Sequence, residues 1–499
     1  MRNKRTKLNI ISSVILQMVT IICGFIVQKL VIKSFGSSVN GLVASITRFL
    51  TYITLLEAGV GPVVKSILFK PIANKDKVTI EKILKTSEKF FRKIAYIFII
   101  YILVLCVVMP IIVSKEFESV FTLSLVIIIA ISTFSEYYFG ITYKIYLQAE
   151  QKTYIISIIH IGTIILNTIM VVVLIKFGAT IQVVKLVSAI IYVLRPILQN
   201  IYVKKKYNIN LKDVEGNYPI KQKWDGLAQH IAYVVHKNTD IVILTFCANI
   251  AEVSVYSVYF TIINRLKSIV QSFVGGVDAA FGDMLAKGEH DILNRAYEKY
   301  EGLYLTIATI LFSSTLFLIV PFVSIYTKGI TDVDYIRPVF AYIMVFAEFI
   351  CIIRQPYNDL VKVAGHFKQT KIGAWVEAIS NIVISLILVW KYGIVGVAIG
   401  TLFAMTIRTI EFMYHCSKYI LKRNIFYTFK RLLVIAIEVG IITLIVNIIP
   451  SIHISNYINW IIQACIVFCI SSLVVLLVNI VFYYKNFKNI IKSRNYKSL

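Results

Sequence analysis

Residues 94–113 read IAYIFIIYILVLCVVMPIIV and contain no charged side chain. A helix of this length is about 30 Å long, which matches the hydrocarbon core of a bilayer. Comparable apolar stretches lie near residues 8–32, 41–64, 120–147, 155–175, 181–203, 227–247, 254–283, 302–323, 335–360, 372–390, 395–415, 432–449 and 457–483. The sequence therefore predicts an all-α polytopic membrane protein with about fourteen transmembrane helices.

The composition supports the same class of protein. Of the 499 residues, 58 % are hydrophobic and only 16 % are charged, and the mean hydropathy is +0.78. The first apolar stretch is longer than the core of a signal peptide and has no small-residue cleavage pattern after it, so we expect it to remain in the mature chain. An even number of spans then places both termini on the same side of the membrane.

The net charge of +26 has two readings, nucleic-acid binding or membrane topology, and the positions of the cations favour topology. Most Lys and Arg residues lie in segments on the side of the amino terminus, at Arg2 to Lys7, Lys65 to Lys93, Lys152, Lys204 to Lys223, Lys287 to Lys299, Lys362 to Lys371, Lys418 to Arg431 and Lys485 to Lys497. Positive charge of this kind marks the cytoplasmic face. We therefore expect cytoplasmic termini and no nucleic-acid partner.

The first six spans recur in the next six at an offset of 213 to 215 residues. The matching segments are Val39 with Val253, Glu57-x-x-x-Gly61 with Gln271-x-x-x-Gly275, Ile72 to Asp76 with Leu285 to Glu289, and Lys176-Phe177-Gly178 with Lys391-Tyr392-Gly393. Collinear matches indicate a duplication, which is common in secondary transporters. The predicted parts are a six-helix bundle at 1–203, a cytoplasmic linker at 204–226, a second bundle at 227–415, and accessory helices with a tail at 416–499. The function is then to be sought between the halves.

Catalytic and metal chemistry have little support in the sequence. The seven cysteines show neither C-x-x-C spacing nor alternation with histidine, so no metal or other cofactor is expected. The segments between spans on the outer side are short, which leaves little room for the active site of a membrane glycosyltransferase or polymerase. No glycine-rich phosphate loop or nucleophile elbow is present. The sequence therefore favours a protein that is not an enzyme.

Three motifs resemble those of a known family. They are Phe35-Gly36-x-x-Val39-Asn40-Gly41-Leu42, the run from Leu55 to Gly61, and Lys70-Pro71-Ile72-Ala73. Together with the layout of twelve plus two spans, they resemble the polysaccharide repeat-unit flippases (Wzx-type) of the multidrug/oligosaccharidyl-lipid/polysaccharide (MOP) superfamily. The resemblance covers nearly the whole chain.

The resemblance implies a MOP/MATE-like arrangement of two pseudo-symmetric bundles in a bacterial inner or plasma membrane. The implied activity is outward movement of an undecaprenyl-pyrophosphate-linked oligosaccharide by alternating access, for capsule, O-antigen or another surface polysaccharide. The implied partners are this lipid-linked oligosaccharide, membrane lipids, a polysaccharide polymerase and other assembly proteins.

Cations within the spans are the candidate ligands for a pyrophosphate. Arg48 and Arg265 are the strongest candidates, because no acid lies within one turn of either on its own helix and the repeat places them at similar depth. Lys267, Lys29 and Arg354 are further candidates for a cationic cavity. Snorkelling to the membrane surface or pairing with an acid on another helix remains the alternative for all five.

Acidic residues within the spans are candidates for proton or charge relay. They are Glu57 and Glu348, together with Asp240 beside Lys237, and the last two are spaced to neutralise each other. A purely structural role is the alternative for Glu57: it would brace a helix that is distorted by nearby glycines and Pro62. Arg408 and Glu411 repeat the spacing of Lys237 and Asp240 and are expected to be structural.

Other functions stay open on these residues. A multidrug or organic-cation antiporter of the same superfamily would present unpaired acids to its substrate, and Glu57, Asp240 and Glu348 keep this reading open. A flippase for another prenyl-linked precursor and a membrane glycosyltransferase or polymerase are the remaining alternatives. Glycosyltransferase and polymerase genes next to this gene would favour a polysaccharide pathway over drug export.

Overall fold

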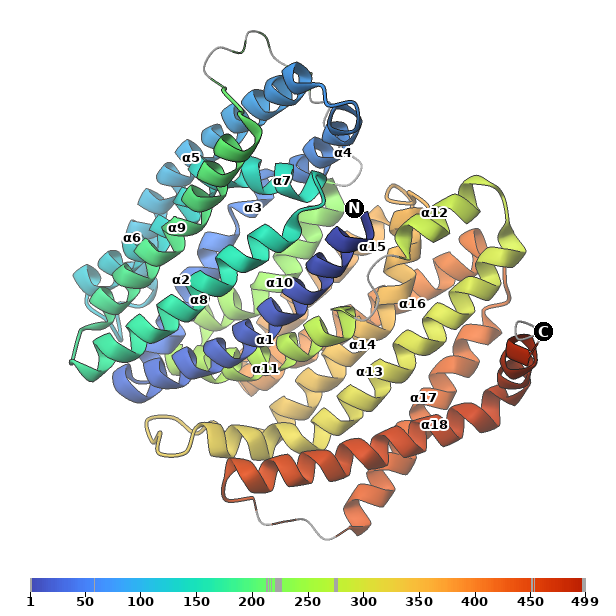
Figure 1. The fold of residues 1–499 in the computed structure, drawn as a ribbon. Coiled ribbons are helices and arrows are strands. Elements are labelled where there is room, and N and C mark those ends of the chain that lie inside the picture. Colours follow the sequence, from blue (N-terminus) through green and yellow to red (C-terminus); the bar gives the residue numbers. More distant parts are fainter. Residues whose placement is uncertain are drawn as a thin grey trace. The chain divides into compact units, whose positions relative to one another are not determined.

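The computed structural model describes residues 2–57, 59–211, 214, 216, 218–219, 227–272, 277–449, 452 and 454–495. All regular elements in this part of the chain are helices (Figure 1). Contacts divide the chain into two compact units, which we call the N-unit (Met1–Ser257 with Gly329–Val333) and the C-unit (Val258–Lys328 with Asp334–Leu499). The all-α prediction is therefore confirmed.

The N-unit contains the first ten α-helices, one π-helix and the beginning of the eleventh α-helix. Its elements are α1 (Arg2–Phe35), α2 (Ser37–Thr51), α3 (Thr54–Glu57), α4 (Val60–Ala73), α5 (Lys77–Ile112), α6 (Ser119–Ser135), the π-helix η1 (Glu136–Gly140), α7 (Ile141–Ala149), α8 (Thr153–Lys176), α9 (Ile181–Tyr207), α10 (Leu227–Cys247) and the start of α11 (Ile250–Ser272). Helix α1 packs along α8, and α9 packs against both α6 and α8. Phe91, Phe98 and Leu125 are fully buried in the core of this unit.

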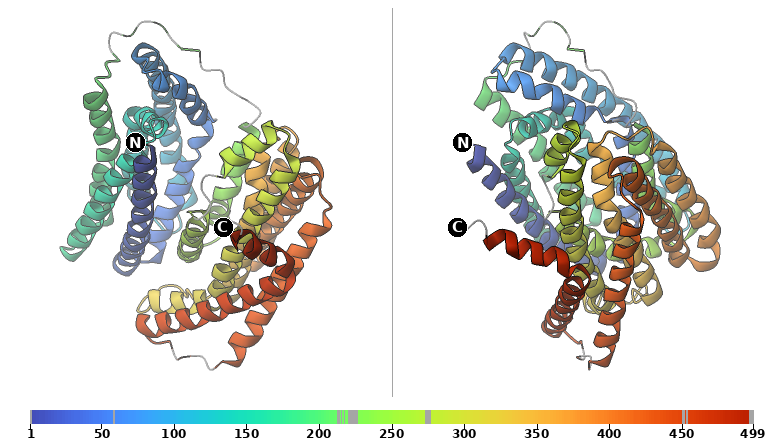
Figure 2. Two further views of the ribbon diagram at one scale, coloured as in Figure 1. Left: turned by 45° about the vertical axis from the view of Figure 1, so that its right-hand side comes forward. Right: turned by 90° about the vertical axis from the view of Figure 1, so that its right-hand side faces the viewer.

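The C-unit contains the rest of α11 and all later elements. These are α12 (Asp278–Ala286), α13 (His290–Tyr326), α14 (Pro338–Val363), α15 (Lys371–Tyr392), α16 (Ile394–His415), the π-helix η3 (Cys416–Ile420), α17 (Phe426–Ile448) and α18 (Tyr457–Asn495). Helix α16 packs against α14 and α15, and α18 lies along α13 and α17 (Figure 2). The division by contacts falls at Ser257 rather than in the predicted linker at 204–226, so the predicted bundle boundaries stay a prediction.

Twelve helical segments of the described chain are long and apolar enough to cross a membrane. Helices α10 and α11, which correspond to the predicted spans 227–247 and 254–283, are not among them, although they contain 21 and 23 residues. Helix α10 carries two charged residues, Lys237 and Asp240, and α11 carries three, Glu252, Arg265 and Lys267. The described part of helix α11 reaches Ser272, and the rest of the predicted span up to residue 276 lies outside the described residues. The chain is a multi-pass membrane protein.

The predicted span 41–64 is not a continuous helix. Helix α2 ends at Thr51, α3 is a single turn, and α4 begins after Gly59, whose φ of 74° lies in the left-handed region. Glycine adopts this conformation without the steric cost that a Cβ atom imposes. The distortion expected from the glycines and Pro62 is therefore present, and it places Glu57 at the break. Residues 58 and 273–276, which include Gly275, lie outside the described part of the chain.

Helix α5 begins at an exposed cap. The Asp76 carboxylate accepts hydrogen bonds from the hydroxyl of Thr79 (2.6 Å) and from its backbone N–H (3.0 Å), and these bonds lower the pKa of Asp76. An acidic N-cap also interacts favourably with the positive end of the helix dipole. The cap fixes the start of α5, whose first part, residues 77–93, precedes the apolar stretch at residues 94–113.

Candidate functional site

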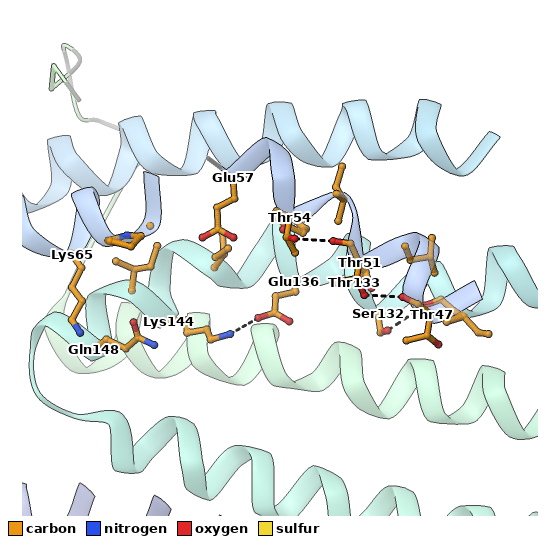
Figure 3. A pocket seen from close by; sticks show the side chains of 18 residues that line it. Thr47, Thr51, Thr54, Glu57, Lys65, Ser132, Thr133, Glu136, Lys144 and Gln148 are labelled. Carbon is orange, nitrogen blue, oxygen red and sulfur yellow. Dashed lines mark hydrogen bonds and ion pairs between the residues drawn. The ribbon is translucent and has the colours of Figure 1, made fainter. Parts of the chain in front are cut away.

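The N-unit contains a cavity of about 630 Å³. One wall is formed by α2, α3 and α4, and the other by α6, η1 and α7 (Figure 3). The residues that line it and carry polar groups are Thr47, Thr51, Thr54, Glu57, Lys65, Ser132, Thr133, Glu136, Tyr137, Lys144 and Gln148. We refer to this space as the N-unit cavity.

Charged side chains gather toward one end of the N-unit cavity. Lys65 and Gln148 lie at that end, followed by Glu57, Glu136 and Lys144 (Figure 3). Lys144 Nζ is 2.6 Å from Glu136 Oε1, so these two charges neutralise each other. The remaining formal charges in the cavity are one carboxylate, Glu57, and one ammonium group, Lys65.

Hydroxyl groups line the other end of the N-unit cavity, where Thr47, Thr51, Ser132 and Thr133 lie (Figure 3). Thr47 and Thr51 donate to carbonyl oxygens four residues earlier in α2, at 2.7 and 2.8 Å, and Ser132 donates to Ile129 O at 3.3 Å. Because each donated proton is already used inside a helix, these oxygens are available mainly as acceptors. This end is therefore suited to a ligand that offers many hydroxyl donors.

Glu57 lies at the helix break, next to Gly61. A Cβ atom at position 61 would be 2.7 Å from Glu57 Oε1, so the missing side chain leaves room for the carboxylate. His230 on α10 lies close by, with Nε2 3.1 Å from Thr54 O. Glu57 therefore faces the cavity in a polar setting, and its predicted relay role stays a prediction.

A second, smaller space of about 100 Å³ shares Ser132, Thr133 and Glu136 with the N-unit cavity. We call it the side chamber. Its other lining residues are Gly140, His160, Tyr192, Arg195, Pro196 and Gln199. It is bordered by α6, η1, α8 and α9, so it also lies entirely within the N-unit.

Arg48 is a half-buried residue in the last turn of α2 and does not line the N-unit cavity. Two groups interact electrostatically with the Arg48 guanidinium group: the hydroxyl of Tyr256 on α11 and the carboxylate of Asp240 on α10. Asp240 is buried and accepts a hydrogen bond from the Tyr256 hydroxyl at 2.7 Å. A carboxylate on another helix therefore lies close enough to act on the charge of Arg48, and the role of Arg48 as an anion ligand stays a prediction.

Lys237 and Asp240 do not share the environment expected from their spacing. Lys237 is exposed, and its ammonium group is 3.4 Å from the hydroxyl of Tyr233, whereas Asp240 is buried. Within the described chain, the polar partner of Lys237 is Tyr233 rather than Asp240. No hydrogen bond or ion pair joins Lys237 to Asp240 in the described chain, and the relay role of these residues stays a prediction.

Arg265 and Lys267 on α11 belong to the C-unit and differ in their partners. Lys267 is ion-paired with Glu348 on α14, and its ammonium group also lies 3.5 Å from Cys351 Sγ. Arg265 is half-buried, and no described residue forms a hydrogen bond or an ion pair with it. Of the two, Arg265 remains the candidate for an anionic ligand.

Arg354 is part of a buried charge network in the C-unit. Its guanidinium group is 2.6 Å from Glu377 on α15, and Arg408 Nε is 3.4 Å from the other oxygen of Glu377. Arg408 is also paired with Glu411 and donates to Thr370 O at 2.8 Å. The structural role expected for Arg408 and Glu411 agrees with this arrangement. The partner of Arg354 is thus an acid on another helix, which is the alternative given for it above, and its cavity role stays a prediction.

Lys29 lies on α1 of the N-unit and is half-buried. Its neighbour Gln28 donates to the hydroxyl of Ser257 at 3.3 Å. The structure thus places this predicted residue on a helix of the N-unit, and its cavity role stays a prediction. Among the described residues, no three His, Cys, Asp or Glu side chains are placed to hold a metal ion.

No family model matches the sequence, and no curated protein matches it. The structure is similar to that of the lipid II flippase MurJ in an inward closed conformation, with a TM-score of 0.70 and 14 % identity over 96 % of this chain and 99 % of that chain. An inward-facing multidrug resistance MATE family transporter of the MOP superfamily gives a TM-score of 0.61 and 14 % identity, over 83 % of this chain and 99 % of the other. The chain has a MOP-superfamily fold.

A eukaryotic MATE transporter, AtDTX14, has the same fold, with a TM-score of 0.58 and 12 % identity over 82 % of this chain and 94 % of that one. The predicted MOP/MATE-like fold is therefore confirmed. At these identities the similarity concerns the fold alone, so the Wzx-type resemblance remains a prediction.

Within the MOP-superfamily fold, sequence reasoning missed the Glu136–Lys144 pair and Arg195. Glu136 and Lys144 are eight residues apart in one apolar span, and the π-helix η1 lies between them. Short π-helical segments occur frequently at functional sites. Two opposite charges inside one predicted span were the available signal, because charges within the membrane are costly unless they are paired or functional.

The side chamber depends on close packing between η1 and α9. A substitution that adds one methyl group at this contact tests the packing. A Cβ atom at position 140 would lie 2.4 Å from Pro196 Cβ and 3.0 Å from Pro196 Cα. We expect Gly140→Ala to destabilise the protein by about 1–3 kcal/mol through overpacking, measured as a lower midpoint of thermal unfolding in detergent. Gly162→Ala on α8 is the matched control, because nothing lies within 4 Å of its Cβ position. Equal midpoints for the two variants would contradict this packing.

Proposed function

We propose that the protein is a transporter that moves undecaprenyl-pyrophosphate-linked oligosaccharide repeat units from the cytoplasmic to the outer leaflet. The transport would proceed by alternating access and supply the synthesis of a surface polysaccharide. The proposal concerns a bacterial cell membrane with both termini in the cytoplasm, as the distribution of Lys and Arg suggests.

The observation that carries the proposal is the polar N-unit cavity. A glycan loses its hydrogen bonds to water when it crosses the membrane, and leaving such groups unpaired is costly. The threonine and serine oxygens of the cavity accept hydrogen bonds, and Glu57, Lys65 and Gln148 add charged and amide groups. At about 630 Å³, the cavity has room for several sugar residues.

Two further features favour a lipid-linked substrate over a small drug. The similarity to the lipid II flippase extends over 96 % of this chain, compared with 83 % for the MATE transporter of the MOP superfamily. Arg265 in the C-unit is a half-buried cation that suits a pyrophosphate, because a guanidinium group binds phosphate oxygens in two-point geometry. The neighbours of this chain are transporters and a flippase, which supports a function other than catalysis.

Depletion of the protein tests the proposal directly. We expect lipid-linked oligosaccharide to accumulate in the cytoplasmic leaflet, because the lipid carrier cannot cross the membrane with its glycan attached. Membrane-impermeant labelling of the glycan in inside-out and right-side-out vesicles measures the amount in each leaflet. Re-expression of the wild-type protein is the control and restores the outer pool. An unchanged distribution after depletion would refute the flippase.

A multidrug or organic-cation antiporter is the second candidate, and Glu57 in the N-unit cavity is the observation that favours it. The MATE-family neighbours add fold-level support. Altered drug sensitivity after depletion, without accumulation of lipid-linked oligosaccharide, would place this candidate first.

A peptidoglycan precursor is a further lipid-linked substrate, and chemical analysis of the accumulated glycan distinguishes it from a polysaccharide repeat unit. Contact with a polysaccharide polymerase and other assembly proteins belongs to the same proposal.

A further inference from the structure

The side chamber has the size and the surroundings of a binding site for a single sugar residue. A cavity needs about 10–15 Å³ of such space for each water molecule. The chamber volume of about 100 Å³ therefore corresponds to roughly seven to ten waters, about the room that one monosaccharide residue fills. Its boundary with the N-unit cavity is formed by Ser132, Thr133 and Glu136, which line both spaces.

Arg195 on α9 is held in a fixed orientation at the side chamber. Its Nε donates to Thr163 Oγ1 on α8 at 2.8 Å, and its guanidinium carbon lies 4.1 Å from the centre of the Tyr192 ring. These two contacts fix the plane of the guanidinium group. Within the described chain, no carboxylate is ion-paired with Arg195, and no residue accepts a hydrogen bond from its two terminal NH₂ groups. The fork that binds a planar anion is therefore available.

The neighbouring charges leave the side chamber with a net positive charge. Glu136 is the acid that lines the chamber, and its carboxylate is already paired with Lys144 at 2.6 Å. Gln199 is 2 % exposed, and its Nε2 lies 3.5 Å from Nε2 of His160. Amide and imidazole groups of this kind exchange hydrogen bonds with hydroxyl groups. Two cations, Arg195 and Lys144, therefore act on one carboxylate, Glu136, and the rest of the chamber offers neutral hydrogen-bonding groups.

We infer that the side chamber binds one acidic sugar residue of the glycan, with its carboxylate on Arg195 and its hydroxyl groups on Gln199, His160 and Thr133. The inference rests on the proposed function and specifies its substrate class. A carboxylate carries a single charge and presents two oxygens in one plane, which matches the fork of one guanidinium group. A pyrophosphate diester carries about two charges, more than the chamber compensates.

Saturation-transfer NMR on the purified full chain in detergent tests the inference, with sodium glucuronate as the probe. We expect a signal with the wild-type protein and a signal at least five times weaker with Arg195→Gln. Lys185→Gln is the matched control, because Lys185 lies on the same helix and lines neither space, and it should keep the wild-type signal. Gln199→Leu is a second chamber variant, and we expect it to weaken the signal as well if Arg195→Gln fails to fold.

Glucose and inorganic phosphate identify the chemistry that is recognised. Glucose at the same concentration should give a clearly weaker signal than glucuronate, and phosphate should compete poorly. Equal signals for glucose and glucuronate would overturn the acidic-sugar assignment. So would displacement of glucuronate by phosphate at one tenth of the glucuronate concentration, or an unchanged glucuronate signal in both chamber variants. Accumulation on depletion without any glucuronate signal would remove this inference and leave the flippase. A signal without accumulation would leave a sugar site in a protein of another function.

Discussion

The Glu377→Ala variant is expected to unfold at a midpoint roughly 5 °C below that of the wild-type protein, measured by thermal unfolding in detergent. Glu377 compensates two buried cations, Arg354 at 2.6 Å and Arg408 at 3.4 Å. Removing one partner of a buried ion pair costs about 3–5 kcal/mol, because the remaining charge stays buried without compensation. Here two guanidinium groups lose the same carboxylate, and the side chain of Arg408 is only 3 % exposed.

Glu411→Ala is the matched control for this result. Glu411 also pairs with Arg408, but its side chain is 30 % exposed, so solvent screens the pair. Exposed ion pairs contribute about 0–1 kcal/mol, and we expect a correspondingly small change in the midpoint. Glu377→Gln keeps an acceptor for Arg354 and should fall between the two. If Glu377→Ala unfolds at the same temperature as Glu411→Ala, the network does not stabilise the C-unit.

Loss of Arg265 is expected to give the largest effect on transport. Arg265→Ala should lower outward movement of the lipid-linked oligosaccharide about ten- to a hundredfold, because hydrogen bonds to charged groups contribute about 1.5–3 kcal/mol. Since no described residue pairs with Arg265, the variant leaves no buried charge uncompensated in that part of the chain, and its unfolding midpoint should stay near that of the wild type. The measurement is the accumulation of substrate in the cytoplasmic leaflet at matched expression.

Two further variants, Arg265→Lys and Arg48→Ala, are to be compared with Arg265→Ala in transport and in thermal stability. The lysine variant keeps the charge and loses the fork, so we expect partial transport. Arg48→Ala removes a cation that lies in the field of Asp240, and it should lower stability more than Arg265→Ala does. Asp240→Asn in the Arg48→Ala background should restore part of that stability. Normal transport by Arg265→Ala would remove Arg265 from the site and leave the flippase function intact.

The sequence predicts the helices of this protein well because long apolar runs have few alternatives in a membrane. The predicted span 155–175, for example, lies within α8, Thr153–Lys176. The break in the second span was anticipated only as a distortion, because sequence alone does not show which glycine adopts a positive φ. Gly59 does so, and α3 and α4 are separated there.

The site was harder to predict than the fold, because charges find partners on other helices. The partner of Arg354 is Glu377, 23 positions later, and the partner of Lys267 is Glu348. Neither pair follows from helical spacing. Arg195 was overlooked although it lies well inside the predicted span 181–203, where a cation is costly unless it is paired or functional. In the structure, Thr163 and Tyr192 hold it at the side chamber.

The contact between Glu57 and Gly61 has a consequence for how this protein and its relatives evolve. A Cβ atom at position 61 would lie 2.7 Å from Glu57 Oε1, so a larger residue there requires the Glu57 carboxylate to shift. Substitution of Gly61 alone pushes the carboxylate out of its place, whereas a chain with a shorter residue at position 57 tolerates alanine or serine at 61. In an alignment of related sequences, these two positions should therefore change together, and an acid at 57 should be inherited with glycine at 61.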